Sequence, residues 1–297
     1  MNNSFEFNGI ITKAVGGVYY ADALDGHIKG ENVKCAARGI FRNRKISPAA
    51  GDRVRVSVCD NAEPVIEEIF ERRNYLPRPP LANLDGIVFV NSTAEPKINR
   101  FVLDKLIAIA DGNGIEPIVV FTKIDLESAG EFPRIYEKIG IPVRSVNNLT
   151  GEGAEKLREL IEGKFCAFVG NSGVGKSSLL NALYPELLLK TAEISKKLGR
   201  GRHTTRQVEL FKIGGNYVAD TPGFSAVELE NYCDIPREEL DLAFREFREP
   251  RCKCRFSDCR HVKETGCAVK KAVEDGEIAE SRYNSYLRLL EEKKSEY

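Results

Sequence analysis

The chain has 297 residues, of which 42% are hydrophobic and 30% are charged. A chain of this length and composition buries a substantial core, and its length favours about two domains. Lys plus Arg and Asp plus Glu both number 44, so the net charge gives no support for a polyanionic partner. Residues 1–6 lack a basic start followed by an apolar run, and the apolar stretches elsewhere are short. We therefore expect a cytoplasmic protein that neither is exported nor crosses a membrane.

Short apolar runs separated by turn residues occupy the N-terminal part of the chain. Asp52 to Val58 alternates polar and apolar residues with period two, which indicates a strand with one buried face. Similar runs span Gly9 to Tyr20, Val33 to Ile40 and Val65 to Phe70. We predict a small all-β barrel of the OB type over residues 1–75.

The character of the chain changes after the predicted barrel. Asn74 to Pro80 ends in three prolines within four positions, and we predict a linker without regular structure. Beyond it, apolar strands alternate with helical stretches, which is typical of a parallel, doubly wound α/β sheet. The strands are expected at Gly86 to Val90, Pro117 to Phe121 and Phe165 to Val169, and a helix at Phe101 to Ala110. We assign this core to residues 76–228.

The last part of the chain, residues 229–297, shows helical spacing and no further strand pattern. Two sets of residues each share one face of a predicted helix: Leu240, Ala243, Phe244 and Phe247, and then Tyr283, Tyr286, Leu287 and Leu290. A cluster of cysteines lies between these two predicted helices.

A phosphate-binding pattern, GxxxxGKS, spans Gly170 to Ser177. It follows an apolar strand and precedes a run compatible with a helix, which is the context that this motif requires. Backbone N–H groups and the helix N-terminus would face phosphate oxygens, Lys176 would reach the β and γ phosphates, and Ser177 would bind magnesium. The predicted nucleotide-binding residues of this loop are Gly170, Asn171, Ser172, Gly173, Val174, Gly175, Lys176, Ser177 and Ser178.

A guanine-recognition pattern, Thr122-Lys123-Ile124-Asp125, lies upstream of the phosphate loop and not downstream of it. The Asp125 carboxylate would accept hydrogen bonds from the ring N–H and amino group of guanine, which adenine cannot supply. The stem of Lys123 would cover the base. Thr122 stands where Asn is usual, so we expect a looser hold on neighbouring loops with the base-reading carboxylate intact. Ser145 to Asn147 is a weaker candidate for donating a backbone N–H to the guanine carbonyl.

A nucleotide-switch pattern, DxxG, runs from Asp220 to Gly223. Asp220 would lie near magnesium through water, and the Gly223 N–H would face the γ phosphate. Between the two phosphate motifs, a threonine would bind magnesium while the γ phosphate is present. We favour Thr205 for this role, with Thr204 as the alternative.

The position after the switch glycine is Phe224, which cannot hydrogen-bond to an attacking water molecule. We therefore expect slow intrinsic hydrolysis and take His203 as a candidate for the missing water-positioning catalytic group. A surface or RNA-facing histidine is the alternative. Two stretches carry basic residues without acids, Arg38 to Lys45 and Ser195 to Arg206, and each is either a solvated face or an RNA contact. An arginine of the second stretch is also a candidate for assisting hydrolysis.

The cysteine cluster has the spacing C-x4-C-x-H-x5-C, which supplies three thiolates and one imidazole. Such a set is typical of a structural zinc site with no position open for catalysis. The predicted ligands are Cys254, Cys259, His261 and Cys267, with Cys252 competing for the first place. The isolated cysteines are interpreted as small core residues: Cys35, Cys59, Cys166 and Cys233.

Together these residues closely resemble the circularly permuted, small-ribosomal-subunit-dependent GTPases of bacteria, the RsgA/YjeQ type. The resemblance covers almost the whole chain and rests on TKID, GNSGVGKSS, GRGRHTTR, DTPGF, the barrel, and the cysteine motif that includes Phe256. It implies an α/β P-loop GTPase core, circularly permuted, with an N-terminal OB-like β-barrel that binds RNA and a C-terminal helical zinc-binding domain.

The resemblance also implies a function. It implies hydrolysis of GTP with Mg²⁺, stimulation by the small ribosomal subunit, one structural Zn²⁺ and a role in late maturation of that subunit. The expected partners are the subunit and its rRNA, and we expect a monomer. Because permutation places the γ-phosphate sensor directly before the zinc region, we expect hydrolysis to move that region relative to the barrel.

Three alternatives share part of the pattern. A permuted GTPase acting on the large ribosomal subunit would have the same motif order, but the barrel and the zinc site argue against it. An RNA-binding module with a vestigial nucleotide site would not need Lys176, Ser177, Asp125 and Asp220 intact. A P-loop kinase for a small molecule would have no use for Asp125.

Overall fold

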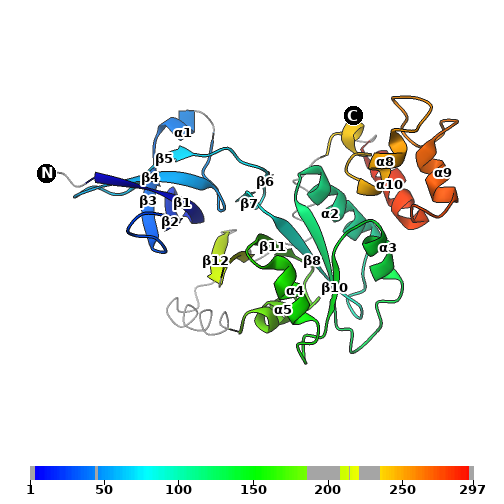
Figure 1. The fold of residues 1–297 in the computed structure, drawn as a ribbon, viewed down its shortest axis with the longest axis horizontal. Coiled ribbons are helices and arrows are strands. Elements are labelled where there is room, and N and C mark those ends of the chain that lie inside the picture. Colours follow the sequence, from blue (N-terminus) through cyan, green and yellow to red (C-terminus); the bar gives the residue numbers. More distant parts are fainter. Residues whose placement is uncertain (1–3, 44–45, 186–207, 214, 221–234, 294–297) are drawn as a thin grey trace.

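The computed structural model describes residues 4–43, 46–185, 208–213, 215–220 and 235–293. Figure 1 shows a barrel at one end, an α/β core in the middle and a group of helices at the other end. None of the helices in these ranges is long and apolar enough to span a membrane.

The barrel is closed. Its five strands are β1 (Ser4–Val15), β2 (Val18–Ala23), β3 (Asn32–Ala37), β4 (Arg53–Cys59) and β5 (Val65–Ile69). They follow the order β1-β2-β3-β5-β4, and β4 pairs back with β1. The inward side chains of Phe7, Ile11 and Val56 are buried in its core, and the short helix α1 (Ile40–Asn43) follows β3. The closed five-stranded barrel agrees with the predicted OB-like architecture.

The proline-rich segment after the barrel is a hairpin, so the prediction of a linker without regular structure was wrong. β6 (Tyr75–Pro77) pairs antiparallel with β7 (Pro80–Ala82). The prolines stand at the turn of this short pair, where few ladder hydrogen bonds are lost. Leu76 and Leu81 are fully buried and anchor the hairpin in the central core.

The central sheet confirms the predicted α/β core. Its strands are β8 (Gly86–Ser92), β9 (Glu116–Thr122), β10 (Val143–Val146), β11 (Phe165–Val169), β12 (Glu209–Ile213) and β13 (Asn216–Asp220). The order is β10-β9-β8-β11-β13-β12, with the first five parallel and β12 antiparallel to β13. A single pairing, Lys13 with Glu209, connects β12 to the barrel strand β1.

Helices cover both faces of the central sheet. They are α2 (Arg100–Gly112), α3 (Phe132–Lys138), α4 (Ala154–Ile161) and α5 (Lys176–Leu183). Alternate residues of β8 pack on opposite faces of the sheet. Ile87 and Phe89 pack in the apolar cluster that includes α2, whereas Val88 and Val90 pack in the cluster that includes α4 and α5. This period-two alternation of buried residues is that of a strand buried on both sides.

The C-terminal region is helical, but one predicted helix is absent. Its elements are η1 (Arg237–Glu239), η2 (Arg245–Phe247), α8 (Arg248–Arg251), α9 (Ala268–Glu274) and α10 (Glu280–Glu292). The predicted helix through Leu240 and Phe247 is two 3₁₀ turns, because Phe244 between them has an extended backbone. Phe244 and Phe247 are nevertheless fully buried and belong to the same apolar cluster as Leu103 of α2.

Candidate nucleotide site and metal centre

The carboxyl ends of the parallel strands meet at one edge of the sheet, where all three nucleotide motifs begin. β9 ends at Thr122, the first residue of the guanine pattern, and β11 ends at Val169, directly before the phosphate loop. The backbone of β13 ends at Asp220, the first residue of the switch pattern. Ligands of open α/β sheets bind at this edge.

Glycines of the phosphate loop are required by its backbone. Gly175 caps helix α5 with φ +89°, a conformation that strains other residues. A Cβ atom at Gly170 would lie 2.7 Å from the carbonyl oxygen of Val90, so any larger residue would displace the strand beside it. The loop therefore approaches β8 closely before it turns into α5.

A cavity of about 600 Å³ lies over the phosphate loop. Its lining residues are Lys123, Gly170, Asn171, Ser172, Gly173, Gly175, Lys176, Ser177 and Ser178. Lys123 follows β9, whereas the phosphate loop follows β11, so the fold brings residues from two strands to one cavity. Val174 of the loop does not line the cavity, because it is buried in the apolar cluster beneath. The volume is within the range of small-molecule sites in proteins.

Lys123 is held firmly at this cavity. Its backbone has φ +58°, and its Nζ donates a hydrogen bond of 2.6 Å to the carbonyl oxygen of Glu95. The hydroxyl group of Thr93 lies 3.0 and 2.9 Å from the carbonyl oxygens of Thr122 and Lys123. These contacts fix the start of the guanine pattern against the loop after β8.

Asp125 lies in a second recess of about 520 Å³, beside Ile124 of the same pattern and Ser145 of β10. The parallel pairing of β10 with β9 brings Ser145 there, although it is 20 positions from Asp125 in the sequence. The backbone N–H of Asn147 donates to the carbonyl oxygen of Glu152 at 3.0 Å, so it is not free to bind a guanine carbonyl.

Thr122 binds the phosphate loop directly. Its side chain is fully buried, and its hydroxyl oxygen lies 2.5 Å from the carbonyl oxygen of Val174 and 3.2 Å from that of Asn91. A hydroxyl group has one proton, and the shorter distance assigns it to Val174. The hold on the neighbouring loop that we expected to be looser is therefore provided by one short hydrogen bond.

Several predicted residues of the switch fall outside the part of the chain that the structure describes. These are His203, Thr204, Thr205, Gly223 and Phe224. Asp220 is described only by its backbone at the end of β13.

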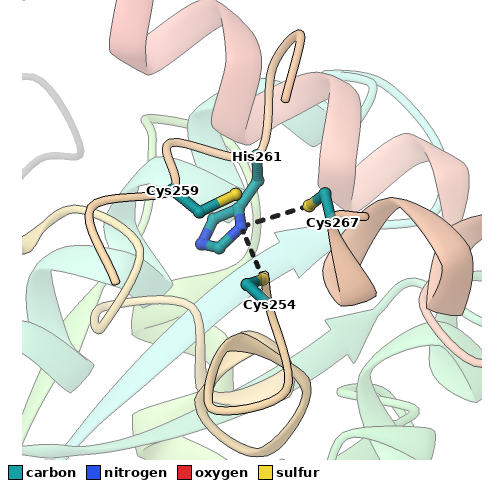
Figure 2. Close-up of side chains that lie close together, drawn as sticks. All are labelled: Cys254, Cys259, His261 and Cys267. Atoms are coloured by element: carbon teal, nitrogen blue, oxygen red, sulfur yellow. Dashed lines mark hydrogen bonds between the residues drawn. The ribbon is translucent and has the colours of Figure 1, made fainter. Parts of the chain in front are cut away.

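The four predicted zinc ligands come together in the C-terminal region (Figure 2). The ligand atoms of Cys254, Cys259, His261 and Cys267 all lie within 4.8 Å of one another. Nδ1 of His261 is 3.6 Å from Sγ of Cys254 and 3.4 Å from Sγ of Cys267. Zinc bonds of about 2.3 Å to sulfur and 2.0 Å to nitrogen place tetrahedral ligand atoms about 3.6 Å apart, so the spacing fits Zn²⁺. Cys252 is exposed and lies outside this group.

Hydrogen bonds within the C-terminal region hold Cys267 and the loop before it in place. Cys267 caps helix α9, and its sulfur accepts a hydrogen bond from the backbone N–H of Lys270. In the loop before it, the Glu264 carboxylate accepts hydrogen bonds from the backbone N–H groups of residues 260, 262 and 263. Burial opposes the charge of Glu264, but these bonds outweigh it and lower the pKa of this carboxyl group to about 2. The loop is therefore organised around a carboxylate that stays charged.

The protein environment of the cluster does not by itself favour thiolates. Burial raises the pKa of the Cys259 thiol to about 12 and also raises the pKa of Cys267. A bound Zn²⁺ would reverse this balance, because it deprotonates the thiols that ligate it. Buried thiols arranged around an imidazole fit a cation of this kind.

Asp241 is a supporting residue that the sequence did not reveal. Its Oδ2 lies 3.5 Å from Nε2 of His261, the ring nitrogen that faces away from the sulfurs, and accepts a 2.7 Å hydrogen bond from Arg251. Burial opposes its charge, but the contacts with His261 and Arg251 lower the pKa of Asp241. A carboxylate on the outer nitrogen fixes the tautomer of a metal-binding histidine. Asp241 is 20 residues upstream of His261 and outside any spacing pattern.

The isolated cysteines divide into two groups. Cys35 and Cys166 are buried, as predicted, and burial raises the pKa of each thiol to about 12. Cys59 is exposed, so its interpretation as a core residue was wrong: it is the last residue of β4 and pairs with Ser4, the first residue of β1. Cys233 lies outside the described residues.

Comparison with known families agrees with this arrangement of motifs. A family model described as RsgA GTPase matches residues 69–230, and one described as RsgA N-terminal domain matches residues 8–66. The chain belongs to the RsgA GTPase family. A relative from Caldanaerobacter subterraneus subsp. tengcongensis, named small ribosomal subunit biogenesis GTPase RsgA, is 46% identical over 290 residues, which are 96% of this chain and 95% of the relative. RsgA 2 of Oceanobacillus iheyensis is also 46% identical, with 96% of each chain covered.

Two solved structures share the fold of this chain. YjeQ from Thermotoga maritima superposes with a TM-score of 0.80 and 34% identity, covering 97% of this chain and 98% of YjeQ. YloQ, described as a circularly permuted GTPase, gives a TM-score of 0.81 and 35% identity, covering 99% of this chain and 96% of YloQ. The inverted motif order is therefore that of a circularly permuted GTPase core.

Proposed function

We propose that this protein binds the small ribosomal subunit and hydrolyses GTP during the late maturation of that subunit. The observation that carries the proposal is that one sheet edge holds a phosphate loop with its cavity and, in the neighbouring recess, Asp125 of the guanine-recognition pattern. The relatives named small ribosomal subunit biogenesis GTPase support the choice of partner.

In this proposal the nucleotide is held by residues of four segments. Backbone N–H groups of residues 170–178 bind the phosphates, Lys176 neutralises the β and γ phosphates, and Asp125 reads the guanine edge. Ser177 and Thr205 would bind Mg²⁺, which supplies charge stabilisation when the nucleotide is bound. Asp220 and Gly223 would sense the γ phosphate.

His203 is the proposed water-positioning residue, because Phe224 cannot serve in that role. His203→Ala should abolish subunit-stimulated turnover and leave GTP affinity unchanged. The alternative is a charge-stabilising arginine from the stretch Ser195 to Arg206. A turnover that is unchanged in His203→Ala would favour the arginine.

We propose that the C-terminal cluster holds one structural Zn²⁺ through Cys254, Cys259, His261 and Cys267. The four ligands leave no position for substrate, so the metal stabilises the fold.

We further propose three domains, a barrel over residues 1–75, the GTPase core over 76–228 and the zinc-binding region over 229–297. The barrel and the two basic stretches would contact rRNA through phosphate charge and shape. The protein would act as a monomer in the cytoplasm.

The deciding experiment measures phosphate release from GTP and from ATP, with and without purified small and large ribosomal subunits. We expect GTP to be preferred and hydrolysis to rise with small subunits alone. Lys176→Ala should abolish the stimulated activity. Stimulation by large subunits would favour the alternative permuted GTPase, a preference for ATP would favour a kinase, and subunit binding without nucleotide binding would favour a vestigial site.

A further inference from the structure

We propose that Asn148 is a positioning residue of the nucleotide site, whose side-chain amide aims a backbone N–H of the phosphate loop into the cavity. This inference rests on the proposed function and names a residue that no motif contains. Asn148 lies in the loop after β10, beyond the Ser145 that borders the Asp125 recess.

Asn148 contacts the phosphate loop at its last glycine. Its Nδ2 donates a hydrogen bond of 3.1 Å to the carbonyl oxygen of Gly175. The approach is close, since a Cβ atom at Gly175 would lie 2.7 Å from this nitrogen. The preceding carbonyl, of Val174, accepts the hydrogen bond from Thr122. Two side chains, one from the end of β9 and one from the loop after β10, thus hold two consecutive peptide groups.

Holding these carbonyls determines where the next N–H groups point. In a planar trans peptide the C=O and N–H bonds point in opposite directions. The bond to Val174 therefore orients the N–H of Gly175, and the bond to Gly175 orients the N–H of Lys176. Both residues line the phosphate cavity. The Gly175 carbonyl also accepts the first helical hydrogen bond, from Leu179 at 2.8 Å, so two donors fix that peptide plane.

The orientation of the Asn148 amide is unambiguous. A reversed amide would set its oxygen against the Gly175 oxygen, with no proton between them. In the assigned orientation Oδ1 is buried and lacks a hydrogen-bond partner among the described residues. The Asn148 side chain therefore donates a hydrogen bond to Gly175 through Nδ2, while its Oδ1 accepts none from the described residues.

The neighbouring residue holds the loop that presents Asn148. The Asn147 side chain is buried, and its Oδ1 accepts hydrogen bonds from the backbone N–H groups of Leu149 at 2.9 Å and Thr150 at 3.3 Å. This turn fixes the Asn148 backbone against the phosphate loop. Because Thr122 replaces the usual asparagine of the guanine pattern, Thr122 and Asn148 share the task of clamping the loop.

The test compares two substitutions of this one side chain, Asn148→Ala and Asn148→Asp, by titration with fluorescent GDP and fluorescent ADP. Loss of one hydrogen bond should weaken GDP binding about five- to tenfold in Asn148→Ala. Asn148→Asp should bind more weakly still at neutral pH, because a carboxylate then faces the Gly175 oxygen. ADP binding should fall by the same factor, since Asp125 is untouched and the clamp acts on the phosphates.

Lowering the pH distinguishes the clamp from a general effect on folding. In Asn148→Asp the introduced carboxyl group, once protonated, can donate a hydrogen bond to Gly175. The GDP affinity of this variant should therefore rise relative to that of Asn148→Ala as the pH falls. Lys123, Asp125 and Lys176 border the site in both variants, so their titration cancels in this ratio.

Two further measurements complete the test. The amide resonance of Lys176 in the GDP complex should shift in both variants, because its peptide group loses the Asn148 donor. Leu149→Ala, at an 85% exposed neighbour, is the control and should bind as the wild type does.

Unchanged GDP affinity in both variants would overturn the inference. So would a weakening that comes with a lower melting temperature and shows no pH-dependent recovery, or a selective loss of GDP over ADP, which would indicate base reading. If the wild-type chain itself binds no guanine nucleotide, the proposed function fails and not the clamp alone.

Discussion

The hydroxyl group of Tyr217 donates a hydrogen bond to Oδ2 of Asp22 across 3.1 Å and so joins the GTPase core to the barrel. Asp22 belongs to β2 and is only 6% exposed, and its other oxygen accepts a 2.6 Å hydrogen bond from Asn32. Tyr217 belongs to β13, the strand that ends at Asp220. The barrel is therefore attached to the strand that leads into the predicted γ-phosphate sensor.

Breaking this contact should weaken the attachment of the barrel. Tyr217→Phe should lower the free energy of unfolding by about 1 kcal/mol, because it leaves a buried carboxylate oxygen without its neutral donor. Asp22→Asn should lower the free energy of unfolding by a similar amount, and the double variant should lower it by less than the sum of the two single losses. Urea unfolding of the four proteins measures the coupling energy. Additive losses would show that the two side chains act independently.

The opposite side of the core is joined to the C-terminal region by buried charges. Arg282 of α10 is fully buried, and its guanidinium group donates to Asp104 of α2 at 2.9 Å and to Glu246 at 2.7 Å. Ser285 and Tyr136 also donate to Asp104, at 2.6 and 3.1 Å. This network lies next to the apolar cluster that Phe244 shares with α2. The C-terminal region is therefore packed directly against the GTPase core and not hinged to it.

Arg282→Met should destabilise the protein by about 3–5 kcal/mol, because two carboxylates would remain buried without a cation. Arg288→Ala is the matched control on the same helix: this arginine is 62% exposed in its pair with Glu292, so its loss should cost less than about 1 kcal/mol. Chemical denaturation of the two variants provides the comparison. Equal losses would mean that the buried network contributes little.

The two attachments change the expected mechanical response to hydrolysis. Since the C-terminal region shares a core with α2, it should move together with the GTPase core, and the barrel should be the part that changes place. We expect solution scattering to differ between the complexes with GDP and with a non-hydrolysable GTP analogue, either alone or on the subunit. Identical profiles in all four states would exclude such a movement.

Removing the carboxylate behind His261 should weaken metal binding. Asp241→Asn should lower Zn²⁺ affinity about 10- to 100-fold, because the ring would lose the partner that orients it. Competition with a colorimetric chelator measures the affinity, and circular dichroism follows the loss of helix on metal removal. Asp258→Asn, an exposed residue beside Cys259, should bind zinc as the wild type does. Equal affinity in Asp241→Asn would remove Asp241 from the site.

Thiol reactivity should follow burial and pKa. The pKa of Cys35 and of Cys166 is about 12, so at pH 8 both remain protonated and lack the nucleophilic thiolate. Iodoacetamide should therefore modify the exposed Cys59 and Cys252 before Cys35 and Cys166, and raising the pH from 7 to 9 should not make Cys35 reactive. Peptide mass spectrometry of the alkylated protein checks the order. Early modification of Cys35 would show that the barrel opens readily.

The sequence predicted the site where chemistry is local. Phosphate binding needs consecutive backbone N–H groups at a strand-to-helix turn, so its residues must be adjacent in the chain, and the predicted segment from Gly170 to Ser178 does line the cavity except at Val174. The same holds for the candidate metal site, whose four side chains lie within one short segment. The proline-rich hairpin and the 3₁₀ turns near Phe244 were not predictable, because burial of Leu76 and Phe244 against distant residues overrides local propensity.

By itself, the amino-acid sequence determined that two nucleotide motifs occur in inverted order, that four candidate metal ligands lie within one short segment, and that a barrel precedes an α/β core. Tertiary structure alone decided how these parts act on one another. Thr122 reaches Val174 across 52 positions and Asn148 reaches Gly175 across 27. Asp241 reaches His261 across 20, and Arg282 reaches Asp104 across 178. Such contacts depend on which strands and helices pack side by side, and the spacing of residues within a short segment does not predict that packing.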